Sequence, residues 1–193
     1  MAYRPRILAL AGSTRIDSFN KKLVRIAADG AREAGAEVTV VDLRGFALPI
    51  FEEDLEAREG MPEAARKLKA LFNAHDGLLI ASPEYNSSIT PVLKNAIDWA
   101  TRREAGEPPL GSFRGKTAVI LSASPGPLGG LRGLVALRML LGNIQVNVLP
   151  EQQTIAQAHE ALTPEGRLKD AAQEAAVKAL GARLAEVLAR LHG

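Results

Sequence analysis

Residues 12 to 20, GSTRIDSFN, bring many hydrogen-bond donors together in one short segment. They supply several hydroxyls, an amide, a guanidinium and the free N–H groups expected where a helix begins. A helix N-terminus favours negative charge by about 0.3 to 1 kcal/mol, and Arg15 would add charge-assisted hydrogen bonds. A phosphate monoester, with a charge of about −1.5 to −2, suits such a segment better than a carboxylate or a pyrophosphate. The alternative is structural: Ser18 only caps the helix, and water surrounds Arg15.

Two further segments are candidates for the same site. The first is PEYNSSI (83–89), followed by Thr90 and Pro91, a pair typical of a helix start. Tyr85 could contact a flat heteroaromatic ring, while Asn86 and main-chain N–H groups bind its polar edge; the alternative is a turn packed by its own tyrosine. The second is SASPGPLGG (122–130), whose small residues permit close approach of a ligand or simply form a flexible connection.

Short and long apolar patterns alternate along the chain and predict the elements that position these segments. Short runs typical of strands cover Ile7–Ala11, Val38–Leu43, Gly77–Ser82, Thr117–Ser122 and Ile144–Leu149. Helical faces are formed by Leu23, Ile26, Ala27, Ala31 and Ala34; by Ala65, Leu68, Leu71 and Phe72; by Leu93, Ala96, Ile97 and Ala100; by Leu131, Leu134, Val135, Arg138 and Leu141; and by Leu180, Leu184, Val187, Leu188 and Leu191. Such alternation predicts an α/β fold, a parallel sheet with helices on both faces.

The character of each strand predicts its place in the sheet. The first, third and fourth runs are continuously apolar, as expected for strands buried on both faces. The second and fifth contain polar residues and are expected at the edges. With right-handed crossovers this favours the flavodoxin-like order 2-1-3-4-5 in a three-layer sandwich. Ligands of such folds bind at the carboxyl ends of the strands, where all three donor segments would meet.

Composition limits the possible classes of protein. A length of 193 residues predicts a single domain, residues 1–193, without a linker or repeat. The absence of cysteine excludes thiolate zinc sites, iron–sulfur clusters and thiol catalysis, and it fits a reducing cytoplasm. A net charge of +2 without a basic run gives no argument for nucleic acid. The apolar stretch Ile7–Ala11 is too short for a signal peptide or a membrane span, so we expect a cytoplasmic protein.

Several catalytic patterns are missing. There is no G-x-x-x-x-G-K-[ST] and no G-x-G-x-x-G, which argues against a P-loop and a dinucleotide-type pyrophosphate site. Without HExxH or a visible Ser-His-Asp set, hydrolysis has no argument from the sequence, and no metal site is predicted. His75 is expected to cap a helix, Lys94 to lie on an exposed helical face and Trp99 to lie in the core or an interface. The long connection from Arg44 to Met61 is either a functional loop or a solvent-exposed surface loop without a function.

Taken together, GSTRIDSFNKKL, SPEYNSSITPVLKNAIDWATR and SASPGPLGG resemble the NADPH-dependent FMN reductase family, close to bacterial chromate and quinone reductases. The resemblance covers nearly the whole chain. It implies a flavodoxin-like fold that holds flavin mononucleotide (FMN) without a covalent bond. It further implies that NADPH or NADH donates hydride to N5 of the flavin and leaves, after which a small-molecule acceptor binds in the same place, a ping-pong scheme.

The resemblance also assigns roles to residues. Ser13, Arg15, Ser18 and Asn20 would hold the phosphate, and Pro83, Glu84, Tyr85 and Asn86 would line the isoalloxazine ring. Ser124 would close the site. The predicted cofactor-binding set is completed by their neighbours Thr14, Phe19, Ser87 and Gly126.

Acceptors expected from the resemblance are quinones, azo compounds, free flavin and metal oxyanions such as chromate. A homodimer is expected and a tetramer is possible. Arg132 and Glu151 match tetramer contacts of relatives, but Val135 stands where those relatives carry tyrosine. Two other functions stay open: a flavodoxin-type electron carrier, and a regulatory or scaffold protein that binds no cofactor.

Overall fold

The computed structural model describes residues 3–193, which contain one parallel sheet of five strands. These are β1 (Arg6–Ala11), β2 (Glu37–Asp42), β3 (Gly77–Ala81), β4 (Thr117–Ala123) and β5 (Asn147–Ile155). Their order, β2-β1-β3-β4-β5, confirms the predicted order and both predicted edges. The three inner strands are buried almost throughout, whereas β2 and β5 are only partly covered.

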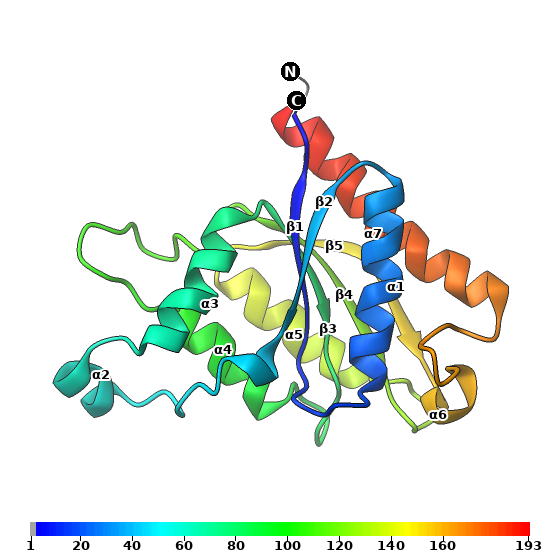
Figure 1. Ribbon diagram of the computed structural model, residues 1–193, viewed down its shortest axis with the longest axis horizontal. Helices are drawn as coiled ribbons and strands as arrows, with labels where there is room; N and C mark the ends of the chain where they lie inside the picture. Colours follow the sequence, from blue (N-terminus) through cyan, green and yellow to red (C-terminus); the bar gives the residue numbers. More distant parts are fainter. Residues whose placement is uncertain (1–2) are drawn as a thin grey trace.

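Helices cover both faces of the sheet and complete a three-layer sandwich (Figure 1). They are α1 (Phe19–Glu33), α2 (Glu53–Glu59), α3 (Glu63–Ala74), α4 (Pro91–Thr101), α5 (Leu131–Asn143), α6 (Ala158–Ala161) and α7 (Ala171–His192), with a 3-10 turn, η1 (Leu43–Gly45). One apolar core lies between the sheet and α1 with α7, and a second lies between the sheet and α3, α4 and α5. All five predicted helices are therefore present. Within residues 3–193, no helix is both long and apolar enough to cross a membrane.

Two sequence predictions are wrong in detail. The fifth strand is not Ile144–Leu149: Ile144 ends α5, Gln145 has a φ of +68°, and the strand continues to Ile155. Its register against β4 shifts between Ala118 and Ile120, which accommodates Pro150 at a sheet edge where a missing N–H costs little. On α5, the buried face is Leu134, Leu137 and Leu141, whereas Leu131 and Val135 are exposed.

The long connection after β2 is more ordered than the sequence predicted, since it contains η1 and α2. Two side chains of α4 hold its middle. The carbonyl of Pro49 accepts hydrogen bonds from Asn95 Nδ2 at 2.9 Å and from Trp99 Nε1 at 2.8 Å. Phe51 N–H donates to Asn95 Oδ1 at 2.8 Å. Trp99 is thus a core residue with its indole N–H satisfied, as one of its two predicted alternatives required.

Candidate functional site

Three loops meet at the carboxyl ends of β1, β3 and β4, at the lower edge of the molecule in Figure 1. We call residues 12–18 the first loop, residues 82–90 the second loop and residues 124–130 the third loop. Because the order of the strands reverses between β1 and β3, this edge is the expected ligand-binding end of the sheet. The structure thereby brings together the three segments that the sequence singled out.

The first loop turns sharply after β1 and leads into α1. Ser13 N–H donates to the carbonyl of Ala11 at 2.8 Å, and Ser13 Oγ accepts from Arg15 N–H at 3.3 Å. Ser18 is the N-cap, since its Oγ accepts from Lys21 N–H at 3.4 Å. Its hydroxyl hydrogen is still available to a ligand, so capping and binding are compatible roles.

Donors remain free at the start of α1. Within residues 3–193, the N–H groups of Phe19 and Asn20 have no acceptor. Arg15 is exposed, with its guanidinium 5.9 Å from the centre of the Phe19 ring. The carboxylate of Asp17 lies on the same loop, but Lys22 Nζ compensates its negative charge at a distance of 2.5 Å. This hydrogen bond lowers the pKa of Asp17. The N-terminus of α1 is therefore an electropositive surface with unused hydrogen-bond donors.

Asn20 has a structural function that the sequence did not reveal. Its side chain is buried; Nδ2 donates to the carbonyl of Ala123 at 2.8 Å, and Oδ1 accepts from Ala123 N–H at 2.9 Å. This pair of hydrogen bonds joins the start of α1 to the end of β4. The residue predicted as a phosphate ligand is thus already bonded to the backbone that begins the third loop.

The second loop contains a tight hairpin turn at Tyr85–Ser88. Tyr85 and Ser88 exchange backbone hydrogen bonds of 2.9 and 3.0 Å, and the two central residues, Asn86 and Ser87, have φ angles of +50° and +64°. These angles are those of a type I′ turn, in which a serine with positive φ is strained. Within the described chain, the N–H groups of Asn86 and Ser87 have no acceptor. The turn exposes Tyr85, more than half of whose surface is accessible.

Hydrogen bonds tie the second loop to its neighbours. Thr90 Oγ1 donates to the carbonyl of Gly12 at 2.6 Å and also accepts from Leu93 N–H at 3.3 Å, which confirms the predicted helix start. A Cβ at Gly12 would lie 2.9 Å from Cβ of Leu93, so only glycine permits this approach. On the other side, Ser122 Oγ donates to the carbonyl of Ser82 at 2.7 Å.

Glu84 faces α5. Its Oε1 accepts from Arg132 Nε at 3.1 Å and lies 3.0 Å from Nη2 of the same arginine; its Oε2 accepts from Gly133 N–H at 3.0 Å. The side chain is largely buried. Of the sequence-derived tetramer contacts, Arg132 is thus paired within the chain, and Glu151 is paired with Arg183 at 3.3 Å.

Two adjoining hollows lie among these loops. The first is lined by Ser13, Arg15, Ser18, Phe19, Asn20, Pro83, Glu84, Tyr85, Ala123, Ser124 and Pro125. The second is lined by Gly12, Ser13, Thr14, Arg15, Tyr85, Thr90, Pro91 and Val92. Most predicted site residues are therefore gathered here, and the cofactor contacts themselves stay predictions.

Some residues differ from the expected set. Asn86, Ser87 and Gly126 line neither hollow; Gly126 N–H donates to Ser124 Oγ at 3.1 Å and shapes the third loop. Six residues line a hollow but are not in the predicted cofactor-binding set: Gly12, Thr90, Pro91, Val92, Ala123 and Pro125. The apolar side chains of Val92, Ala123 and Pro125 carry no signal of binding, since these residues take part only through their places at the start of α4, at the end of β4 and in the third loop.

A separate hollow lies between α3, α4 and the loop after α4, and its polar groups partner one another. Lys69 pairs with Glu107, and Ser112 Oγ donates to Asn73 Oδ1 at 2.7 Å. His75, expected to cap a helix, ends α3: its ring nitrogens bond the carbonyl of Leu71 at 2.6 Å and Thr39 Oγ1 at 2.8 Å. Unused donors therefore distinguish the crevice between the three loops from this hollow.

Comparisons with known proteins identify the family of the chain. A model of the family described as NADPH-dependent FMN reductase matches residues 5–160. The chain is 38% identical over 166 residues to an NAD(P)H-dependent FMN reductase of Pseudomonas aeruginosa, covering 86% of this chain and 85% of that protein. It is 33% identical over 144 residues to a quinone reductase of Escherichia coli strain K12, covering 73% and 71%.

Solved structures give the same result for the fold. FerB, a flavoenzyme NAD(P)H:(acceptor) oxidoreductase from Paracoccus denitrificans, matches with a TM-score of 0.78 and 28% identity over 96% of this chain and 98% of that chain. A flavodoxin from the domain Archaea matches with a TM-score of 0.62 at 10% identity, covering 95% of this chain and 98% of that chain. The second match concerns the fold alone.

Proposed function

Because this chain belongs to the NADPH-dependent FMN reductase family, an oxidoreductase family, we propose that it binds FMN in the crevice between its three loops and reduces small-molecule acceptors with NAD(P)H. The single observation that carries the proposal is the set of unused donors at the start of α1, directly beside an exposed tyrosine and a strained turn.

The first loop fits the phosphate of FMN. Two main-chain N–H groups, the Ser18 hydroxyl and the exposed Arg15 guanidinium are available at a helix N-terminus, where a dianion is favoured. Asn20 would act mainly by fixing the start of α1 against β4, since its amide already bonds Ala123. Ser13 and Thr14 lie on the same loop and add hydroxyls.

The second loop fits the ring of the flavin. The free N–H groups of Asn86 and Ser87 can donate to the carbonyl oxygens and nitrogens at the polar edge of the isoalloxazine. Tyr85 offers an aromatic face to the ring system. Ser124 and Pro125 border the same hollow from the third loop and limit its width.

When bound, FMN supplies the redox chemistry, taking a hydride from NAD(P)H and passing two electrons to an acceptor. The chain's own residues position the ring and keep its environment fixed, so we name no catalytic acid or base. For a quinone the balance is NAD(P)H + H⁺ + quinone → NAD(P)⁺ + hydroquinone. Because both substrates would use one open crevice, ping-pong kinetics are expected, with parallel lines in double-reciprocal plots; intersecting lines would contradict the shared site.

Quinones are the acceptors we favour, since similar proteins are named quinone reductases. Azo compounds, free flavin and chromate-type oxyanions are further candidates to assay in parallel. The decisive experiment is the visible spectrum of the purified protein, reconstituted with FMN, before and after anaerobic addition of NADPH or NADH. Rapid bleaching followed by recovery on addition of 1,4-benzoquinone supports the proposal. A flavin that NAD(P)H cannot reduce would indicate an electron carrier, and failure to take up FMN would overturn the proposal.

We also propose that the protein works as a homodimer in the cytoplasm. Leu131, Val135 and Met139 are exposed four residues apart on α5 and form one apolar stripe. The stripe is symmetric about Val135, so two antiparallel copies of α5 could pack on each other. We expect sedimentation to show a dimer, and Met139→Glu to shift it toward the monomer; a monomeric natural protein would contradict this.

A further inference from the structure

We propose that Glu84 is a positioning residue: by binding the N-terminus of α5, its carboxylate fixes the second loop in the shape that holds the flavin ring. This inference rests on the proposed function and concerns the contact between the second loop and the start of α5.

The contact replaces a missing helix cap. The N-cap of α5 is Gly130, which has no side chain and lies in a left-handed conformation with φ +91°. The N–H of Gly133, in the first turn of α5, finds its acceptor instead in Glu84 Oε2 at 3.0 Å. A carboxylate at this place is favoured by the helix dipole as well as by the hydrogen bond. Glu84 therefore caps a helix that begins 47 positions later in the chain, at Leu131.

The backbones also approach closely at this contact. A Cβ at Gly133 would lie 3.1 Å from Glu84 Cβ and 3.2 Å from the carbonyl oxygen of Ser88. The helix therefore touches the second loop at both sides of the Tyr85–Ser88 turn. With Glu84 held on one side and Ser88 on the other, the strained turn between them has little freedom.

The direction of the carboxylate matters for an anionic cofactor. Glu84 lines the hollow that contains Arg15 and Ser18, yet its two oxygens are bonded to Arg132 and to Gly133. Its negative charge is thus compensated by groups of α5. Loss of this contact would loosen the turn without removing any donor from the phosphate site.

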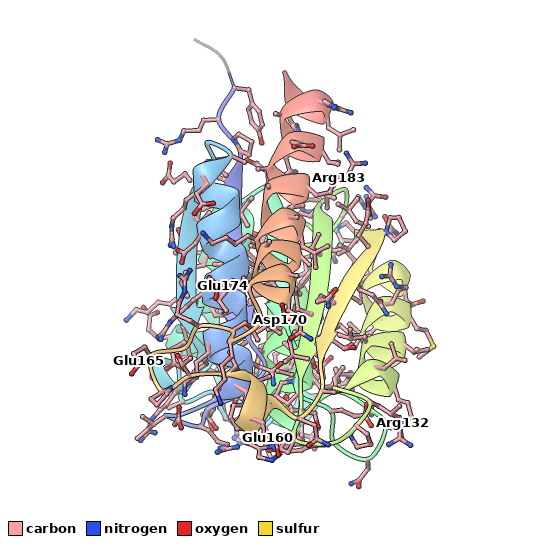
Figure 2. All side chains as sticks on the ribbon, turned by 90° about the vertical axis from the view of Figure 1, so that its right-hand side faces the viewer. Arg132, Glu160, Glu165, Asp170, Glu174 and Arg183 are labelled. Atoms are coloured by element: carbon pink, nitrogen blue, oxygen red, sulfur yellow. The ribbon has the colours of Figure 1, made fainter. Side chains whose placement is uncertain are left out.

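The test separates the two ends of the cofactor. Dissociation constants of FMN and of riboflavin, which lacks the phosphate, are measured by fluorescence for the wild type and for Glu84→Ala, Glu84→Gln and Arg183→Ala. The last variant is the matched control, because it breaks the exposed ion pair with Glu151, far from the site. Figure 2 shows Arg183 part-way along α7, in the upper half of the view, and Arg132 near the lower edge of the molecule, where α5 begins.

We expect Glu84→Ala to weaken FMN and riboflavin binding equally, by about tenfold, because a helix cap with a charge-assisted hydrogen bond is lost. Glu84→Gln keeps an oxygen that accepts from Gly133 N–H, so it should restore most of the affinity. The visible bands of the bound flavin should shift in Glu84→Ala and stay unchanged in Arg183→Ala.

Three results would overturn the inference: unchanged affinity for both flavins in Glu84→Ala, weaker binding of FMN alone, or an unshifted flavin spectrum. If Glu84→Ala does not fold, Gly133→Ala replaces it, since the added methyl separates α5 from the loop while the carboxylate remains. That variant must show the same loss for both flavins. A wild type that binds no FMN would instead contradict the proposed function.

Discussion

The two ends of the sheet carry similar polar residues and use them in opposite ways. At the amino end, Asp76 accepts hydrogen bonds from Tyr3 Oη at 2.8 Å and from three N–H groups of Arg6 at 3.2 to 3.3 Å. Lys116 Nζ donates to the carbonyl of His75 there, and burial lowers the pKa of Lys116. At the carboxyl end, main-chain donors of the first and second loops have no partner within residues 3–193.

This difference separates stability from binding. Groups that satisfy one another stabilise the fold and have little left to offer a ligand. The donors at the carboxyl end are kept in place by hydrogen bonds between segments far apart in the chain, namely Thr90 to Gly12, Asn20 to Ala123, and Gly133 to Glu84. Substitutions at the amino end should therefore change stability alone, and those at the carboxyl end should change flavin binding.

The largest effect is expected for Arg15→Ala. Removing the guanidinium should raise the dissociation constant of FMN by about 5- to 150-fold, from the loss of a charged hydrogen bond of about 1 to 3 kcal/mol. Binding of riboflavin should hardly change, and neither should the unfolding temperature of the apoprotein, because Arg15 is exposed.

Arg25→Ala is the control for this prediction, since Arg25 is an exposed arginine further along α1. Its FMN affinity should equal that of the wild type. Equal losses for FMN and riboflavin in Arg15→Ala would show that the arginine does not bind the phosphate.

Asp76→Ala should have the next largest effect, at the other end of the sheet. It leaves Tyr3 and Arg6 without their shared acceptor, and should lower the free energy of unfolding by about 1 to 3 kcal/mol. FMN affinity should stay unchanged. Denaturant unfolding gives the first quantity and flavin fluorescence the second.

The control is Asp98→Ala, which removes a helix-surface ion pair with Lys94 and should change stability by less than about 0.5 kcal/mol. If Asp76→Ala instead weakened FMN binding at unchanged stability, the division between the two ends would be wrong.

Much of this arrangement could be predicted from the sequence, because the signals are local. Continuous apolar runs identified the inner strands, and Thr90 with Pro91 identified the start of α4. Strand order followed from polarity, which then placed the three loops together. The second half of β5 was missed because its residues Pro150 to Gln153 are not typical of a strand, and an edge position tolerates them.

What could not be predicted depends on pairs far apart in the chain. Asn20 and Ala123 are separated by 103 positions, and Glu84 and Gly133 by 49. Asn20 and Glu84 were expected to contact the cofactor, and nothing in their immediate neighbours indicates that each first bonds a distant backbone. The exposure of Val135 was likewise invisible, because the helical period of α5 permits two apolar faces.

Ser18→Ala tests a residue that is expected both to stabilise the fold and to bind FMN. As the N-cap of α1 it should contribute about 1 kcal/mol to stability, and its free hydroxyl hydrogen should also support FMN by a few-fold. Asp170→Ala removes the matching cap of α7, whose carboxylate accepts from Ala172 N–H at 2.8 Å. Asp170 lies at the start of that helix (Figure 2). The two variants should lose similar stability, but only Ser18→Ala should lose FMN affinity. Equal FMN affinity in both would assign Ser18 to the fold alone.

The smallest expected effect concerns the pH dependence of the free energy of unfolding. Burial raises the pKa of Asp76, but hydrogen bonds from Arg6 and Tyr3 outweigh it and leave this pKa below its ordinary value. A carboxyl whose pKa is lowered by folding contributes stability above its unfolded pKa, about 3.9, and loses it as the pH falls through the folded value. Between pH 6 and pH 3 the wild type should therefore lose more unfolding free energy than Asp76→Asn, which cannot titrate. The difference should be below about 1 kcal/mol, because Arg6 is half exposed to solvent. Parallel pH profiles would show that the network at the amino end is stabilised by hydrogen bonds without a contribution from the charge of Asp76.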